Sequence, residues 1–208
     1  DLAALVALYR PGPMAANMHN DYANRKNGRQ EISYLHPELK EILDPTYGLM
    51  IYQETLMRVA QEIAGFTLAE ADILRKACGK KIRSLILEQR KAFVAGCVAQ
   101  GHDAKVGNDI FDVIEPFADY AFSSSHAFSY GLIAYQTAYL KANFPVEYLS
   151  CLLTSVKDKP EKIVVYLNEC RLLEIPVLIP DINNSQVDFA PVGDTITFGL
   201  SAIKGVGE

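Results

Sequence analysis

Apolar residues recur at helical spacing through most of this chain, and this periodicity limits the possible fold more than any other feature. It predicts helices near residues 52–64, 67–77, 82–100, 104–116, 123–144, 146–156 and 160–173. A shorter stripe of Leu2, Leu5, Val6 and Tyr9 is ended by RPGP, because proline cannot continue a helix. Residues 15–46 are polar and are expected to be irregular, with an exposed turn at NRKNGRQ.

The pattern changes after Leu173. The stretches IPVLIP and ITFGL are short and β-branched, and DINNSQ and PVGD near them form turns, so a few strands are expected. The chain is therefore predicted to be mainly α, with a helical domain over 1–173 and a small β-containing segment over 174–208. Thr67 with Glu70, and Asp158 with Glu161, are predicted capping boxes.

The composition is that of a folded globular protein: half of the 208 residues are apolar. No apolar run approaches the ~20 residues of a membrane helix. The chain lacks a starting Met and a signal peptide and begins inside a helical pattern, so we expect a segment of a longer protein. Cys97, Cys151 and Cys170 lie among apolar helical residues, and no cysteines have metal-ligand spacing, so buried, reduced thiols and a cytoplasmic location are expected.

A basic cluster stands out in this acidic chain, whose net charge is −5. The segment from Asp72 to Lys91 contains seven cationic residues and only two acidic ones. Arg75 and Lys76 end one predicted helix, and Lys80 and Lys81 open the next, with Gly79 expected in a left-handed conformation between them. Helix N-termini and cationic side chains bind phosphate. Two interpretations stay open here, namely a phosphate site and a solvated helix face.

A second candidate is SSSHAFSY, residues 123–130. His126 falls in the first helical turn, and Tyr130 lies four residues later on the same face. An imidazole and a phenol at a positive helix end can bind a phosphate and stack on a base. The alternative is that His126 caps the helix and Tyr130 belongs to the core.

The end of the chain and its carboxylates complete the list of candidates. IKGVG, at 203–207, could be the hairpin of a helix-hairpin-helix, whose backbone N–H groups bind DNA phosphates. Two-metal phosphoryl transfer needs clustered aspartates, and no DxD occurs in the sequence. Neither catalytic residues nor a metal site are therefore expected in this chain.

Several runs of the sequence, in this order, resemble the alpha subunit of bacterial DNA polymerase III. They are ALYRPGPM (7–14), HPELKEIL (36–43), TYGLMIYQE (46–54), ADILRKACGKK (71–81), FADYAFSSSHAFSYGLIAYQTAYLKANFPVEY (117–148), PDIN (180–183) and GLSAIKGVG (199–207). The resemblance covers essentially the whole chain. It implies the fingers domain followed by the start of a helix-hairpin-helix region, with the catalytic aspartates in a palm domain outside this chain.

Residues that match the family's motifs acquire expected roles from the resemblance. Those implied at the incoming nucleotide are Arg75, Lys76, Lys80, Lys81, Ser125, His126, Tyr130 and Arg10. Those implied at DNA are Lys204, Gly205 and Gly207. Cys78 stands where the family usually has Met, and Ser123 and Ser124 replace its usual Asn-Lys, which removes a cation beside the expected site.

The resemblance implies a DNA-directed DNA polymerase, a nucleotidyltransferase of DNA replication. Its implied partners are a DNA primer-template, the incoming dNTP and other replicase subunits, with no membrane. Mg²⁺ would be bound by the full-length enzyme through ligands outside this chain, and the segment alone is expected to be inactive. The alternative is a non-catalytic helical module that binds DNA backbone or a protein.

Overall fold

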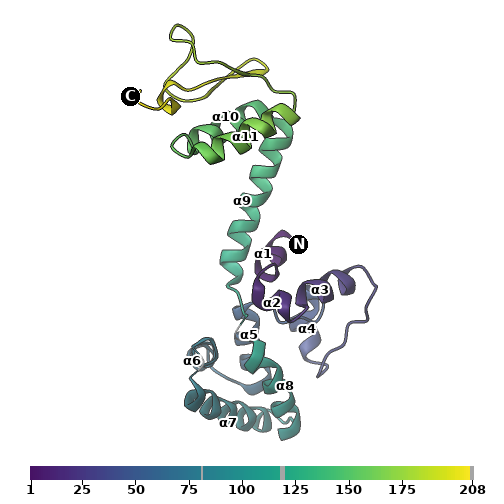
Figure 1. The fold of residues 1–208 in the computed structure, drawn as a ribbon. Helices are drawn as coiled ribbons and strands as arrows, with labels where there is room; N and C mark the ends of the chain where they lie inside the picture. Colours follow the sequence, from purple (N-terminus) through teal and green to yellow (C-terminus); the bar gives the residue numbers. More distant parts are fainter. Residues whose placement is uncertain (81, 118–119, 207–208) are drawn as a thin grey trace. The chain divides into compact units, whose positions relative to one another are not determined.

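The computed structural model describes residues 1–80, 82–117 and 120–206. The chain divides into two compact units, residues 1–132 and residues 133–208 (Figure 1). Helix α9, Ser124–Asn143, begins in the first unit and continues into the second. No helix among the described residues is long and apolar enough to span a membrane.

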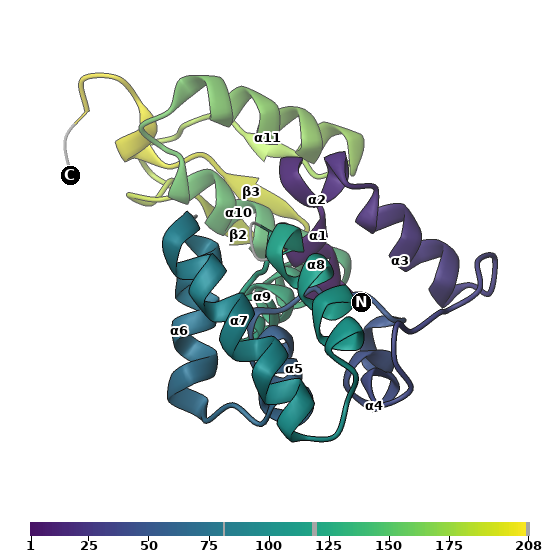
Figure 2. The ribbon, with the colours of Figure 1, turned by 90° about the horizontal axis from the view of Figure 1, so that it is seen from below.

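Four helices form the centre of the first unit. They are α5 (Gln53–Ala64), α6 (Leu68–Gly79), α7 (Arg83–Ala99) and α8 (Ala104–Phe117), and they lie side by side (Figure 2). Leu56, Val59 and Ile63 bury one face of α5 completely. The Phe93 ring of α7 lies between Phe66 and Phe111, with ring centroids 6.0 and 5.7 Å away. The predicted periodicity therefore identified the main core.

Local signals set the ends of these helices. At the start of α6, Thr67 and Glu70 form the predicted capping box. Gly65 and Gly101 follow α5 and α7 with positive φ values of 67° and 93°, which glycine adopts readily. The expectation for Gly79 was wrong, because α6 runs through this residue and its φ is not positive. The final turn of α6 continues to Lys80, whose N–H bonds to the Lys76 carbonyl.

The N-terminal helices of this unit are α1 (Leu2–Leu8), α2 (Pro11–Ala15), α3 (Met18–Lys26) and α4 (Leu39–Leu43), followed by the 3-10 helix η1 (Asp44–Thr46). The expectation that 15–46 would be irregular was thus wrong for α3, α4 and η1. Helix α3 has no buried residue, so it carries no apolar stripe from which it could be predicted. Asn27 and Gly28 do form a turn, with Gly28 at φ 67°.

Helix α1 buries a different face from the one its apolar stripe suggests. Leu2, Leu5 and Tyr9 are exposed, whereas Ala3, Ala4, Ala7 and Leu8 are buried. The small side chains allow close packing against α9, because a Cβ added at Gly131 would lie 3.1 Å from the Ala3 nitrogen. The buried face of α1 is therefore the one whose small side chains allow the backbones of α1 and α9 to approach closely.

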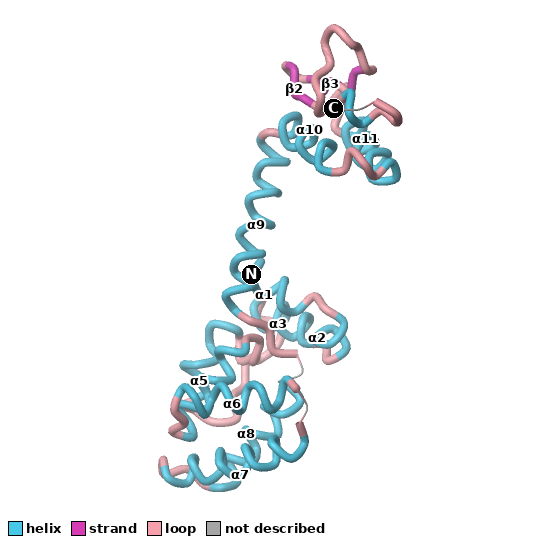
Figure 3. Tube along the Cα trace, turned by 90° about the vertical axis from the view of Figure 1, so that its left-hand side faces the viewer, coloured by secondary structure: helices cyan, strands magenta, loops and turns pink. Residues whose placement is uncertain are grey.

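The second unit packs two helices on a small sheet. Helices α10 (Pro145–Ser155) and α11 (Pro160–Leu172) accompany strands β1 (Val177–Leu178), β2 (Ala190–Val192) and β3 (Thr195–Thr197) and the 3-10 helix η2 (Leu200–Ala202) (Figure 3). The strand order is β1-β3-β2, with β1 parallel and β2 antiparallel to β3. Leu149, Leu153, Ile163 and Ile196 form its buried core.

The predicted fold class, mainly helical with a small β-containing C-terminal segment, is confirmed. The expected change from helices to strands lies at residue 173. The two compact units divide earlier, between residues 132 and 133, because α10 and α11 share a core with the sheet. Two further local expectations were wrong. Helix α11 has Lys159 at its N-cap with no side-chain cap bond, so the Asp158 box is not formed, and Cys151 is exposed.

Candidate nucleic-acid interface

The last turns of α6 place two cations on one carboxylate. Arg75 donates from Nε and a terminal nitrogen to Asp72 Oδ1 at 2.9 and 2.7 Å, and Lys76 Nζ lies 2.6 Å from Asp72 Oδ2. These hydrogen bonds, first from Lys76 and then from Arg75, hold the pKa of Asp72 below its usual range. Asp72 therefore orients both cations and partly neutralises them.

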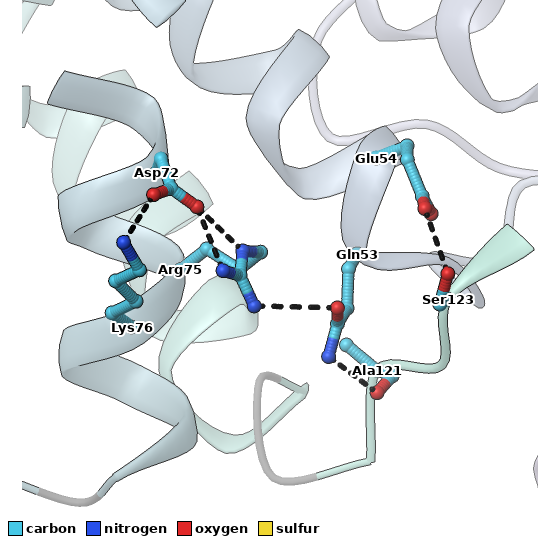
Figure 4. A network of polar contacts seen from close by, with 7 residues as sticks. All are labelled: Gln53, Glu54, Asp72, Arg75, Lys76, Ala121 and Ser123. Atoms are coloured by element: carbon cyan, nitrogen blue, oxygen red, sulfur yellow. Dashed lines mark hydrogen bonds and ion pairs between the residues drawn. The ribbon is translucent and has the colours of Figure 1, made fainter. Parts of the chain in front are cut away.

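Gln53 connects this cluster to the segment before α9 (Figure 4). Its side-chain oxygen accepts a hydrogen bond from Arg75 at 3.4 Å, and its side-chain nitrogen donates to the Ala121 carbonyl at 3.3 Å. The backbones of the two segments also pair, since Gln53 N–H donates to the Phe122 carbonyl and Phe122 N–H donates to the Ile51 carbonyl. One residue at the start of α5 thus links α6 to the start of α9.

The next residue, Glu54, caps α9. Its carboxylate accepts a bond from Ser123 Oγ at 3.2 Å and one from the Ser124 backbone N–H at 2.9 Å. The predicted serine-rich start of this helix is present, but the negative charge at its N-terminus comes from α5. Such a charge stabilises a helix N-terminus, and here it also fixes the position of the following turn.

A row of rings and one guanidinium lies along that turn. The Arg10 guanidinium carbon is 4.5 Å from the centroid of the Phe122 ring, which is 5.3 Å from the His126 ring. His126 is in turn 4.6 Å from the Tyr130 ring. His126 and Tyr130 are exposed, so the alternative in which Tyr130 belongs to the core is wrong. Exposed aromatic faces are suited to stacking on nucleic-acid bases.

Arg10 is held in this row by the backbone. It donates to the Ala7 carbonyl at 2.8 Å and to the Tyr120 carbonyl at 2.5 Å. Partial burial lowers the pKa of Arg10 from its ordinary value. The ring of Tyr120 also covers Gly12, since a Cβ added there would lie 2.3 Å from it. A side chain in place of the glycine of RPGP would therefore displace the Tyr120 ring next to the candidate site.

Three of the residues predicted at the nucleotide remain, namely Lys80, Ser125 and Lys81. Lys80 is exposed and forms no ion pair within the part of the chain that the structure describes. Ser125 Oγ lies 3.0 Å from Ser123 Oγ at the start of α9. Lys81 lies outside the described residues. Of the neighbouring cations, Arg90 is used in packing, because it bonds to Asp112 and Asn108 of α8.

Gln53 and Glu54 were missed as candidates by the sequence reasoning. They form part of the run TYGLMIYQE, whose resemblance to the polymerase family implies no role for either residue. Two adjacent polar residues opening an apolar helix were the available signal. Their partners are more than twenty residues away, so nothing in the local spacing could identify them.

At the end of the described chain, a turn carries the candidate DNA contacts. The Val206 N–H donates to the Ile203 carbonyl at 3.1 Å, and Gly205 has φ 88°, which closes the turn around Lys204. Lys204 and Gly205 are exposed, whereas Gly207 lies outside the described residues. An exposed turn that carries a lysine can present its side chain and backbone to a phosphate.

Metal-binding groups are sparse. Among residues 1–80, 82–117 and 120–206, a single group of three His, Cys, Asp or Glu side chains has converging ligand atoms, namely His36, Glu38 and His102. Arg75 and His126 do not belong to it.

Comparison with known proteins defines the class. Residues 1–101 match the bacterial DNA polymerase III alpha subunit finger domain, and residues 174–208 match a helix-hairpin-helix motif. The first match covers residues 1–101 of the first unit, and the turn at Ile203–Val206 lies in the second match. The fold and the matches together define a polymerase finger segment joined to a helix-hairpin-helix region.

The relatives are more specific. The chain is 55% identical over its whole length to DNA polymerase III subunit alpha of Mycobacterium leprae, 47% to that of Pseudomonas aeruginosa and 44% to that of Escherichia coli. It spans 18% of the length of each of these relatives. The chain belongs to the family of bacterial DNA polymerase III alpha subunits and includes its finger region.

Proposed function

We propose that this chain is the part of a replicative DNA-directed DNA polymerase that binds the triphosphate of the incoming dNTP. The cations near the end of α6, namely Arg75, Lys76 and Lys80, would contact phosphate oxygens. The row formed by Arg10, His126 and Tyr130 would contact the nucleotide's base or sugar. A triphosphate concentrates negative charge, and its transfer spreads charge over non-bridging oxygens, which positioned cations stabilise.

One observation carries this proposal: Gln53 and Glu54 tie the cationic helix α6 to the aromatic start of α9. Segments that are far apart in sequence, at 10, 53–54, 72–80 and 122–130, are thereby held through hydrogen bonds and ring contacts in one unit. A surface decorated with unrelated charges would not require such links. The arrangement is typical of a preorganised binding site.

The cations would act differently from one another. Arg75 and Lys76 share Asp72, so a phosphate would replace or add to contacts that already orient them. Lys80 has no such partner among the described residues and supplies a free charge. Because Arg75 also bonds to Gln53, a shift of α6 toward the nucleotide would be transmitted to the start of α9, which suits a conformational gate for a correct substrate.

The test uses the full-length alpha subunit in single-nucleotide incorporation. Lys80→Ala should raise the KM for dNTP or lower kcat by at least tenfold, while the Kd for primer-template changes less than twofold. The matched control is Lys91→Ala, which removes an exposed lysine of the same basic segment from α7 and should leave both parameters within twofold of the wild type. Equal effects of the two variants would refute the assignment.

The same experiment with Lys80→Ala distinguishes the proposed function from the alternative, a module that binds DNA backbone or a protein. In that case Lys80→Ala would weaken primer-template binding uniformly, and the dependence of log Kd on log salt would become shallower by about one ionic contact. The dNTP parameters would then be unchanged at saturating DNA.

The rest of the proposed assignment concerns partners. The turn around Lys204 and Gly205, in the region matching a helix-hairpin-helix, would contact DNA backbone. Mg²⁺ would be held by carboxylates outside this chain, and other replicase subunits would bind the full-length protein. A cytoplasmic location belongs to the same proposal.

A further inference from the structure

Two histidines and a glutamate from segments 64 residues apart meet in the first unit. His36 and Glu38 precede α4, and His102 follows α7. The His102 Nε2 atom lies 3.4 Å from Glu38 Oε2, and the rings of His36 and His102 meet edge to face with centroids 5.0 Å apart. One potential ligand atom from each of the three residues lies within 4.8 Å of the others.

One ring nitrogen of His36, Nδ1, is buried without a hydrogen-bond partner among the described residues. Buried polar atoms are nearly always paired, and each exception calls for an explanation such as an ion. The His102 side chain is only 11% exposed, whereas Glu38 is 56% exposed, so the group opens to solvent on the carboxylate side.

The backbone around the group is held on both sides. The Leu39 N–H donates to the His36 carbonyl at 3.0 Å, which fixes the turn into α4. The His102 N–H donates to the Cys97 carbonyl at 3.0 Å, after Gly101 has ended α7 with φ 93°. Ligands on a fixed backbone lose little entropy when they bind an ion, so the arrangement favours binding.

We propose that His36, Glu38 and His102 bind a divalent transition-metal ion of the Zn²⁺ class. Two imidazoles and one carboxylate form a donor set that suits Zn²⁺, and three protein ligands leave a fourth position for water. Tetrahedral coordination at about 2.1 Å would place ligand atoms ~3.4 Å apart. The ligand atoms, which lie within 4.8 Å of one another, would therefore move closer by at most about 1.4 Å. The ion would join the start of α4 to the end of α7 and act as a structural cross-link.

The test is a Zn²⁺ titration of this chain after EDTA treatment and removal of any polyhistidine tag, with a chromophoric chelator as competitor. One equivalent of Zn²⁺ should bind. Glu38→Gln and His36→Asn should each raise the Kd at least tenfold, and far-UV circular dichroism checks that the variants fold. Since Glu38 is exposed, Glu38→Gln should preserve the fold even if His36→Asn does not.

Two matched controls complete the design. Glu41→Gln removes an exposed carboxylate of α4, and His19→Asn removes another histidine whose buried Nδ1 lacks a partner among the described residues. Both should leave the Kd within twofold. The absence of stoichiometric binding, equal losses in the controls, or a thiolate-to-metal charge-transfer band with Co²⁺ would each overturn the proposal.

A stability measurement gives an independent readout. Zn²⁺ at about one hundred times its Kd should raise Tm by ~5–10 °C, and EDTA should reverse the rise. Glu38→Gln, with a Kd at least tenfold higher, should reduce the increase by about half or more at the same Zn²⁺ concentration. It should leave the Tm of the metal-free protein within about 2 °C of the wild type, because its carboxylate is exposed. An equal Zn²⁺-dependent rise in that variant would contradict the proposed ligands.

Discussion

Replacing Gln53 with Ala tests the link between α6 and the start of α9. The substitution removes the acceptor of the Arg75 bond, at 3.4 Å, and the donor of the Ala121 bond, at 3.3 Å. Both bonds are long, so each contributes near the lower end of the usual range for its kind, and the sum is about 1–2 kcal/mol. The Gln53 backbone bond to Phe122 is retained, so the helix should still begin at the same residue.

The assay is urea unfolding followed by far-UV circular dichroism. With an m value of about 1.5 kcal/mol/M, the midpoint of the transition of the first unit should fall by roughly 0.7–1.3 M. The matched control is Gln61→Ala, which truncates a half-buried glutamine of the same helix that makes no side-chain hydrogen bond within the described part of the chain. It should change stability by less than about 0.5 kcal/mol.

A double-mutant cycle shows whether the loss belongs to the proposed link. Gln53→Ala combined with Arg75→Ala should be less destabilising than the sum of the two single changes, by about 0.5–1 kcal/mol. If Gln53→Ala has the same stability as Gln61→Ala, or if the two effects simply add, the side chain of Gln53 does not connect the two segments. The structural basis of the proposed site would then be refuted.

Three other predictions concern packing, charge and activity. Gly96→Ala should destabilise the first unit by about 1–3 kcal/mol in urea unfolding, because its Cβ would lie 2.2 Å from the Ala64 carbonyl oxygen. Gly79→Ala should be neutral or slightly stabilising, because a Cβ added there would meet no other segment of the described chain within 4 Å. Equal effects would contradict the close crossing of α5 and α7. Because the pKa of Asp72 is lowered, its carboxylate stabilises the fold at neutral pH, and this contribution is lost as the pH falls below about 4. In acid-unfolding curves the difference in stability between wild type and Asp72→Asn should therefore shrink below that pH. A difference that stays constant would refute the role of the Asp72 charge. The isolated chain should incorporate no nucleotide with Mg²⁺, primer and template, and incorporation by the pure protein would show that the catalytic carboxylates lie within it.

Much of the fold could be predicted because its signals are local. The capping box of Thr67 and Glu70 and the glycines at 65 and 101 act within a few residues, so the sequence showed where these helices begin or end. Two expectations failed where local signals were weak or competing. Helix α3 buries nothing and carries no stripe, and α11 begins after Lys159 because Pro160 already suits the first helical position.

The candidate site could be predicted only in part. The composition around Arg75 and the SSSHAFSY motif indicated phosphate and base binding, since charge and ring chemistry are visible in the sequence. The roles of Gln53 and Glu54 depend on partners in α6 and before α9, which only folding brings near. The same is true of Arg10, whose position over Phe122 depends on a contact between residues more than a hundred positions apart.

The sequence by itself determined that this protein is mostly helical and where its core helices run, through periodicity, caps and turn residues. It also determined which segments carry positive charge. Each of these properties depends on neighbours along the chain. Tertiary structure alone decided which face of α1 is buried, that Arg75 bonds to Gln53 of α5, and that His36 meets His102. These outcomes depend on distances between remote segments, and the packing of backbones and small side chains sets those distances in ways that no local pattern records.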